Sequence, residues 1–259
     1  MSTAVRESRW ALVTGAASGI GRAIAEAVVK SGGRVVAFDL HEDALAAAAA
    51  EIGTSYIPFT GSVSEEEAVR SAVAFADQEL EGIDSLFNVA GALRPAPIVD
   101  MAQQDWDFTL DVVLRGVFLC TKHVAQRMIS REAGGAIVNV ASVNAHLPLY
   151  GGSAYSAAKS GVEMFGRNAA LELGRFGIRV NTVLPGLVAT PMTGFILDNK
   201  SIMAEFNANA VLKRPAQPSE MAGPALFLAS SAASYITGAG LVVDGGYEIG
   251  GYPDLSKYL

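Results

Sequence analysis

The sequence predicts one α/β domain, a Rossmann-type doubly wound parallel sheet with helices on both faces. Short apolar runs alternate with longer helical stretches along the whole chain, which is the pattern of repeated strands and crossover helices. The length of 259 residues fits a single large domain, and no Pro-, Ser- or charge-rich stretch has the composition of a linker. We therefore expect one domain over residues 1–259, with residues 1–8 disordered.

The expected strands are short and nearly continuous in apolar residues, as in sheets that helices cover on both faces. They lie at residues 10–13, 34–38, 55–59, 85–89, 136–140 and 179–184. Helices are expected at 20–30, where Ile24 and Val28 recur at helical spacing, from 42 along an alanine run, from 64, and over 153–175. Ser64 and Glu67 have capping-box spacing, so we expect Ser64 to begin the third helix.

Composition and charge argue against two classes of partner. The net charge of −7, with no run of Lys or Arg, disfavours nucleic acid, whose phosphates require a basic surface. The uncharged stretches 44–50 and 226–243 are too short, or too interrupted by Ser and Gly, to span a bilayer, so no membrane partner is expected. Cys120 is the single cysteine and the first residues lack a signal-peptide pattern, which favours the cytoplasm.

A glycine-rich turn follows the first expected strand. Gly15, Gly19 and Gly21 lie where backbone N–H groups and a helix N-terminus can approach the pyrophosphate of a dinucleotide. A tight turn that merely needs positive φ angles is the alternative explanation of these glycines. Their place between a strand and a helix favours a cofactor site.

Asp39 ends the second expected strand, where a carboxylate can accept hydrogen bonds from both hydroxyls of an adenosine ribose. The same charge repels a 2′-phosphate, and no Lys or Arg stands in the glycine turn before Gly21 or directly after Asp39 to neutralise it. The sequence therefore predicts NAD rather than NADP. The alternative for Asp39 is a solvated carboxylate at a strand end.

Tyr155 and Lys159 fall on one face of the helix expected over residues 153–175, and Ser142 closes the strand before it. A phenol is a poor base at neutral pH, but a neighbouring ammonium and the positive nicotinamide of NAD⁺ stabilise the phenolate. Such a tyrosine can take the proton of a secondary alcohol while the serine hydroxyl holds the same oxygen. Without a cofactor site, a packed ring and a solvated amine would be the favoured explanation of the pair.

Several of these motifs together resemble the landmarks of the classical short-chain dehydrogenase/reductase family. In order, they are Thr14-Gly15-x-x-x-Gly19-x-Gly21, Asn88-x-Ala90-Gly91, Ser142, Tyr155-x-x-x-Lys159, Pro185-Gly186 and Val243-Asp244-Gly245-Gly246. The resemblance covers nearly the whole chain. It implies a sheet of about seven parallel strands with three helices on each side, and Ser142, Tyr155 and Lys159 as catalytic residues.

The resemblance also implies the residues that would bind the cofactor NAD. They are Gly15, Ser18, Gly19, Ile20, Gly21, Asp39, Leu40, Ser62, Val63, Asn88, Ala90, Gly91, Tyr155, Lys159, Pro185, Gly186, Val188 and Thr190. No metal ligand is expected among them. A homotetramer is expected too, with helices around residues 101–130 and 153–175 and the apolar tail 250–259 in subunit contacts.

Three positions depart from the family pattern. Ser62 stands where an aspartate is usual, Val89 replaces the second asparagine of Asn-Asn-Ala-Gly, and Val113 replaces the active-site asparagine. That last asparagine normally helps to hold a proton-relay water, which a valine cannot hydrogen-bond. Backbone carbonyls alone could hold the water, the relay could be slower, or turnover could be lost.

Substrate clues lie in the variable segments. Residues 191–214 are expected to form helices that act as a lid, and their apolar side chains suit a hydrophobic or alicyclic alcohol, although such stripes are most often core packing. Leu93 and Met192 are candidate substrate contacts. Asn144 and His146 could reach a second hydroxyl of a diol, or could simply satisfy the backbone of their own loop.

We expect an NAD-dependent oxidoreductase that transfers a hydride between nicotinamide and a secondary alcohol or ketone. Two alternatives stay open. One is a 3-oxoacyl-type ketone reductase that runs on NADH, and the other is a non-catalytic NAD-binding regulator, motivated by Val113. An enoyl reductase is disfavoured, because the family resemblance would then imply a wider spacing between Tyr155 and Lys159.

Overall fold

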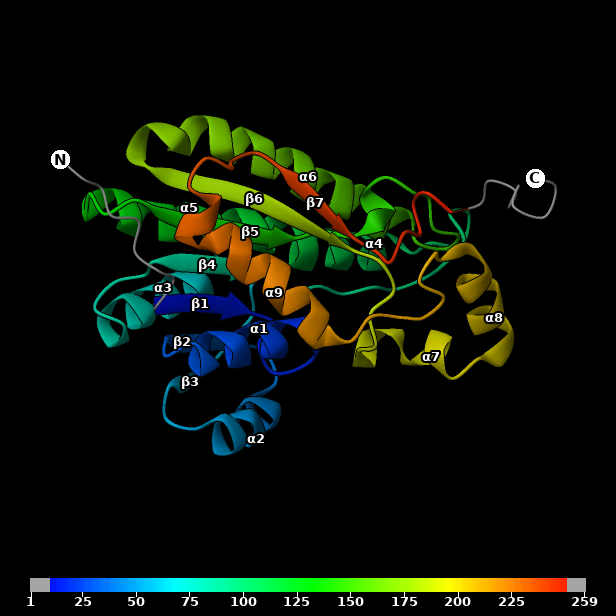
Figure 1. Cartoon of the computed structure of the whole chain (residues 1–259), viewed down its shortest axis with the longest axis horizontal. Coiled ribbons are helices and arrows are strands. Elements are labelled where there is room, and N and C mark those ends of the chain that lie inside the picture. Colours follow the sequence, from blue (N-terminus) through cyan, green and yellow to red (C-terminus); the bar gives the residue numbers. More distant parts are fainter. Residues whose placement is uncertain (1–9, 251–259) are drawn as a thin grey trace.

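The computed structural model describes residues 10–250, and seven parallel strands form its central sheet in the order β3-β2-β1-β4-β5-β6-β7. The strands are β1 Trp10–Thr14, β2 Arg34–Asp39, β3 Tyr56–Thr60, β4 Ser85–Asn88, β5 Gly135–Val140, β6 Ile178–Pro185 and β7 Gly240–Val243. This architecture confirms the expected fold class (Figure 1). The disorder expected for residues 1–8 concerns a part of the chain outside the described residues.

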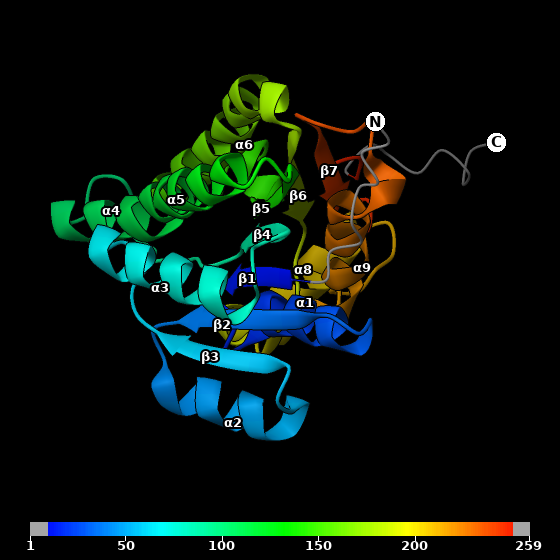
Figure 2. The same ribbon diagram turned by 90° about the vertical axis from the view of Figure 1, so that its left-hand side faces the viewer.

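Three helices cover each face of the sheet, as expected (Figure 2). One face carries α1 Gly19–Lys30, α2 Glu42–Ile52 and α9 Pro218–Ala229. The other carries α3 Glu66–Glu79, α5 Gly116–Ser130 and α6 Ser153–Leu173. Three further helices lie outside these layers: α4 Gln103–Leu110, α7 Gly194–Leu197 and α8 Lys200–Asn209.

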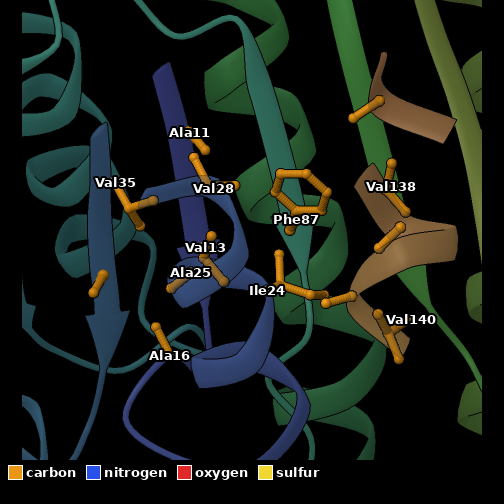
Figure 3. Packing of buried hydrophobic residues seen from close by; sticks show 14 of the residues in the cluster. Ala11, Val13, Ala16, Ile24, Ala25, Val28, Val35, Phe87, Val138 and Val140 are labelled. Carbon is orange, nitrogen blue, oxygen red and sulfur yellow. The ribbon is translucent and has the colours of Figure 1, made fainter. Parts of the chain in front are cut away.

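The packing of α1 explains why the central strands are apolar throughout. Ile24 and Val28 of α1 are fully buried and pack over β1, with Val35 of β2 and Phe87 of β4 on either side (Figure 3). The opposite side of β1 packs against the helices of the second face through Leu12. With both faces covered, no strand position of β1 from residue 11 to 14 faces water.

The start of α3 differs from the expectation. The helix begins at Glu66 after the extended Glu65, and no side chain caps it, so the capping box expected from Ser64 and Glu67 is wrong. The Ser64 hydroxyl instead lies 2.8 Å from the hydroxyl of Ser62, in the turn that precedes the helix. Serines often prefer such local partners, which compete with capping.

The order of the strands reverses between β1 and β4, because the chain winds outward from β1 to β3 and then returns to begin β4. In doubly wound sheets, ligands bind at the carboxyl ends of the strands near this switch point. The segment that contains α7 and α8 lies beyond the same ends of the strands (Figure 1). None of the helices within residues 10–250 has the length and apolar character needed to cross a membrane.

Candidate active site

The glycine turn brings the backbone of β1 against the loop that follows β4. Gly15 has a φ of +65°, and a Cβ there would lie 2.9 Å from the backbone of Ala90. A Cβ at Gly21 would overlap the carbonyl oxygen of Gly15. Both positions therefore require glycine, and the turn leads directly into the N-terminus of α1, where N–H groups are free to receive a phosphate.

Thr14 fixes the loop after β4 beside this turn. Its Oγ1 accepts hydrogen bonds from the backbone N–H groups of Val89 at 2.9 Å and Ala90 at 3.1 Å. Thr14 is buried, so water does not compete for these N–H groups. Sequence reasoning gave Thr14 no role beyond its place in the glycine motif, since the contact joins positions far apart in the chain.

Asp39 holds the other side of the glycine turn. Its Oδ2 accepts from the Ala17 N–H at 3.0 Å and its Oδ1 from the His41 N–H at 3.1 Å. The hydroxyl of Tyr56 adds a hydrogen bond of 2.9 Å to the Ala16 carbonyl. The carboxylate is thereby held in a fixed orientation where it lines the cleft.

One cleft at the carboxyl ends of the strands brings together almost all the expected site residues. Those that line it are Gly15, Ser18, Gly19, Ile20, Gly21, Asp39, Leu40, Ser62, Val63, Ala90, Gly91, Ser142, Tyr155, Lys159, Pro185, Gly186, Val188, Thr190 and Met192. The glycine turn, the N-terminus of α1 and Asp39 make this cleft fit an elongated dinucleotide. Sequence reasoning missed His41, Phe108 and Val112, which also line it.

Asn88 is the exception among the expected cofactor contacts. It is buried below the cleft, where its Nδ2 donates to Asn139 Oδ1 at 2.9 Å and to Thr121 Oγ1 at 3.1 Å. These contacts join β4 to β5 and α5. In this structure Asn88 therefore supports the floor of the cleft rather than lining it.

The three expected catalytic residues meet at the end of the cleft opposite Asp39. Ser142 follows β5, and Tyr155 and Lys159 project from the first turns of α6. The Lys159 Nζ donates to the Val140 carbonyl at 2.7 Å and lies 5.6 Å from the centre of the Tyr155 ring. The ammonium thus lies beside the phenol, held by the last residue of β5, two residues before Ser142.

Burial dominates the electrostatics of this group. It raises the pKa of Tyr155, and a hydrogen bond with Ser142 acts in the opposite direction. Burial also lowers the pKa of Lys159 to about 8. Tyr155 therefore keeps its proton at neutral pH, and additional positive charge in the cleft is what would release it.

Comparison with known proteins agrees with this geometry. A family model described as enoyl-(acyl carrier protein) reductase matches residues 15–248. The D-threitol dehydrogenase of Mycolicibacterium smegmatis is 41% identical over 251 residues and is covered to 94%, as is this chain. The cis-4-hydroxycyclohexanecarboxylate dehydrogenase of Sinomonas cyclohexanicum is 40% identical over 243 residues, covering 92% of this chain and 96% of the relative.

A solved structure shows the same likeness in three dimensions. A short-chain type dehydrogenase/reductase from Mycobacterium marinum has a TM-score of 0.87 and 34% identity, over 92% of this chain and 94% of that one. The chain belongs to the short-chain dehydrogenase/reductase family. Nicotinamide-dependent oxidoreduction is the chemistry of this family's dehydrogenases.

Val113, where this family usually has an asparagine, is fully buried in an apolar cluster. It lies in the π-helical turn Asp111–Arg115 between α4 and α5, and packs with Val117, Ala158 and Leu184. The side chain therefore packs against α6 at Ala158, the residue before Lys159. It offers no polar contact there. Single π turns often mark functional sites, and this turn carries the position where the asparagine is usual.

The expected substrate contacts divide into two groups. Met192 lines the cleft, whereas Leu93, Asn144 and His146 do not. The backbone N–H of Asn144 donates to Ser142 Oγ at 3.1 Å, and its Nδ2 donates to the Leu147 carbonyl at 3.2 Å. Asn144 thus satisfies its own turn, which was the alternative weighed for it.

The segment 191–214 forms helices, as expected. Pro191, Met192 and Thr193 line the cleft from its first turn, which the side chains of Thr190 and Thr193 hold in a capping box. Farther on, Phe206 of α8 stacks on Tyr247, with ring centres 4.6 Å apart and an angle of 9° between the planes. The segment is therefore fastened to the chain that follows β7.

Proposed function

We propose that this protein is an NAD-dependent oxidoreductase that interconverts a secondary alcohol and a ketone. The observation that carries the proposal is the arrangement of Tyr155, hydrogen-bonded to Ser142, with the Lys159 ammonium beside its ring in the same cleft as the glycine turn. A proton acceptor and a second donor to the same substrate oxygen are what alcohol oxidation requires.

In the proposed oxidation, Tyr155 accepts the proton of the substrate hydroxyl. Ser142 donates a hydrogen bond to the same oxygen and fixes the alcohol with its carbinol carbon toward the cleft. Lys159, held by the Val140 carbonyl, stabilises the phenolate that precedes proton transfer. Bound NAD⁺ supplies the acceptor for the hydride that leaves the carbinol carbon.

The proposed preference for NAD over NADP rests on Asp39. Hydrogen bonds from Ala17 and His41 hold its carboxylate at the cleft edge, so the side chain cannot easily swing away from a 2′-phosphate. Leu40, which follows it, is apolar and brings no positive charge. A ribose with free hydroxyls fits this environment better.

The proposed substrate is a hydrophobic or alicyclic alcohol or diol. Phe108, Val112 and Met192 give the cleft an apolar lining. The names of the two relatives, a D-threitol and a cis-4-hydroxycyclohexanecarboxylate dehydrogenase, support an alcohol with a second polar group or a ring.

Reduction of a 3-oxoacyl ketone with NADH is a second candidate, since the same residues serve both directions. The matching family model is described as enoyl-(acyl carrier protein) reductase, which supports an acyl substrate but names a different reaction. The non-catalytic alternative draws on Val113 alone. The intact group of Ser142, Tyr155 and Lys159 argues for turnover.

The test is NADH formation by the purified protein with a panel of secondary alcohols, cyclic alcohols and vicinal diols. We expect turnover with NAD⁺ that exceeds turnover with NADP⁺ and disappears in Tyr155→Phe. NADH consumption with 3-oxoacyl substrates but none of the alcohols would favour the second candidate. Tight NADH binding without turnover in either panel would favour the regulator.

The proposed assembly is a homotetramer. Phe118 of α5 and Met164 and Leu171 of α6 are large apolar side chains exposed on neighbouring helices, which favours burial by another subunit. The tail expected to join this contact lies outside the described residues from position 251 onward. Light scattering tests the assembly. Placement in the cytoplasm stays a prediction, drawn from the single cysteine.

A further inference from the structure

His146 joins two carboxylates on different parts of the chain. Its Nε2 lies 2.7 Å from Glu163 Oε2 on α6, and its Nδ1 lies 2.7 Å from Glu248 Oε1 in the segment after β7. The second contact spans 102 positions of sequence. We use the name His146 clamp for His146, Glu163 and Glu248 together.

The clamp requires a protonated imidazole. A neutral imidazole has one N–H, so one of its two nitrogens would direct a lone pair at a carboxylate oxygen. In the imidazolium both nitrogens donate, and both contacts are favourable. In the clamp, the positive imidazolium therefore lies between two negative carboxylates.

Two further groups face the clamp. Arg167 Nη2 lies 2.5 Å from Glu163 Oε1, on the same helix. The carboxylate of Asp244 is occupied by the backbone N–H groups of Gly246 and Glu248, both at 2.7 Å. Protonated His146 and Arg167 thus balance Glu163 and Glu248, while Asp244 fixes the loop that presents Glu248.

The clamp holds together the parts that carry the reaction. His146 ends the turn that begins at Ser142, where its N–H donates to the Val143 carbonyl at 2.9 Å. Glu163 lies on α6 one turn after Lys159, with only 9% of its side chain exposed. Glu248 is next to Tyr247, which stacks on Phe206 of α8.

We propose that the His146 imidazolium is a positioning residue, which holds the Ser142 turn on the catalytic helix and fastens the lid segment 191–214 to both. The proposal rests on the proposed function, in which Ser142 and Tyr155 act on the same substrate oxygen. Its consequence is a substrate affinity that depends on the protonation of a group outside the cleft. His146 itself contacts no substrate.

Deprotonation releases Glu248 rather than Glu163. Glu163 is the more buried carboxylate and keeps Arg167, so the one remaining N–H stays on it. Glu248, with 21% of its side chain exposed, can turn to water. Partial burial lowers the pKa of His146, but the hydrogen bonds to Glu163 and Glu248 outweigh it and hold the pKa above its ordinary value.

The segment that carries Glu248 and helix α8 are far apart in the sequence, but the fold brings them side by side (Figure 1). The chain after β7 passes beside α8, where the Leu212 N–H donates to the Gly245 carbonyl at 2.9 Å. Loss of the Glu248 contact therefore loosens the segment to which α8 is fastened. We therefore expect deprotonation of His146 to raise the KM for the substrate and to affect kcat less.

The first experiment is an NMR titration of the histidine side chains, which needs no substrate. The chain has three histidines, so His146→Gln assigns the signal of His146. We expect His146 to titrate above free imidazole and to shift to lower pH in Glu248→Gln. Glu205→Gln, which removes the same charge from an exposed position of α8, is the matched control and should change nothing.

The second experiment follows kinetics against pH with the alcohol that the wild type oxidises best. We expect the wild-type KM to rise as the pH passes the His146 titration. Below that pH, Glu248→Gln should raise KM about 3- to 10-fold, the effect of about one ordinary hydrogen bond at a partly exposed site, with kcat within about twofold. Glu205→Gln should keep the wild-type profile.

The two proposals fail in different ways. If the wild type turns over no substrate, the proposed function is wrong. The NMR titration of His146 still tests the clamp, because it needs no substrate. A His146 signal at or below the value of free imidazole and unmoved by Glu248→Gln overturns the clamp. So does an unchanged KM profile in Glu248→Gln when the wild type is active.

Discussion

The ammonium of Lys159 is buried against a backbone carbonyl, that of Val140, at 2.7 Å. The carbonyl is a neutral acceptor, so burial is not offset by an opposite charge and the pKa of Lys159 falls to about 8. The group that the proposed reaction needs therefore costs folding free energy.

Replacement of Lys159 by Met should stabilise the protein without nucleotide. Because one pKa unit corresponds to about 1.4 kcal/mol, we expect the free energy of unfolding at neutral pH to rise by up to about 3 kcal/mol. The folded pKa lies below the unfolded value of 10.5, so the penalty is complete below about pH 8 and disappears as the pH rises through 10.5. Urea unfolding at several pH values measures this. A Lys159→Met protein less stable than the wild type at neutral pH contradicts the expectation.

Asp39→Asn should relax the choice of cofactor. The amide oxygen can still accept from Ala17 or His41, while the charge that repels a 2′-phosphate is gone. We expect the ratio of kcat/KM for NADP⁺ to that for NAD⁺ to rise about 10-fold or more, given the few kcal/mol of a close charge pair. Asp43→Asn, on the first turn of α2, is the control for net charge. Equal changes in both variants would refute a specific role of Asp39.

Thr14→Val should loosen the loop after β4. The backbone N–H groups of Val89 and Ala90 lose their acceptor, and each unpaired buried N–H costs about 1–3 kcal/mol. We expect a loss of about 2 kcal/mol in unfolding free energy and a higher KM for NAD⁺. Thr14→Ser keeps the oxygen and serves as the control. Calorimetry compares the stabilities of the two variants. If Thr14→Ser loses as much stability as Thr14→Val, the methyl group and not the oxygen is what matters.

Val113→Asn tests the departure from the family pattern. Its neighbours Val117, Ala158 and Leu184 offer no side-chain partner to an amide, so we expect a loss of about 1–3 kcal/mol in stability and no gain in kcat. Val117→Asn, in the same cluster, measures the polarity cost alone. A faster Val113→Asn enzyme with an altered pH profile would show that the usual asparagine does improve the proton relay.

Local patterns in the sequence predict most of the fold and much of the cleft. The apolar strands, the helix that carries Tyr155 and Lys159, and the glycine turn follow from periodicity and from positions that only glycine can fill. Each of these features depends on neighbours within a few residues. Such features can be recognised without knowing how the chain packs.

Most of the contacts that the sequence did not predict depend on distant partners; Ser64 is the exception, since Ser62 is only two residues away. Asn88 was expected at the cofactor, but its place opposite Asn139 follows from the register of β4 on β5. Ser64 was expected to cap α3, but Ser62 offers its hydroxyl a closer partner. The two contacts of His146 join three segments of the chain, and no periodicity in the sequence indicates them.

The switch point between β1 and β4 divides the cleft between two halves of the chain. Asp39 and Ser62 belong to the first half, with β2 and β3, whereas Ser142, Tyr155 and Lys159 belong to the second, with β5 and α6. Substitutions that change the proposed coenzyme choice and substitutions that change the proposed substrate would therefore fall in separate stretches of the gene. Recombination of two such genes near the codons for β4 would exchange one trait and leave the other intact.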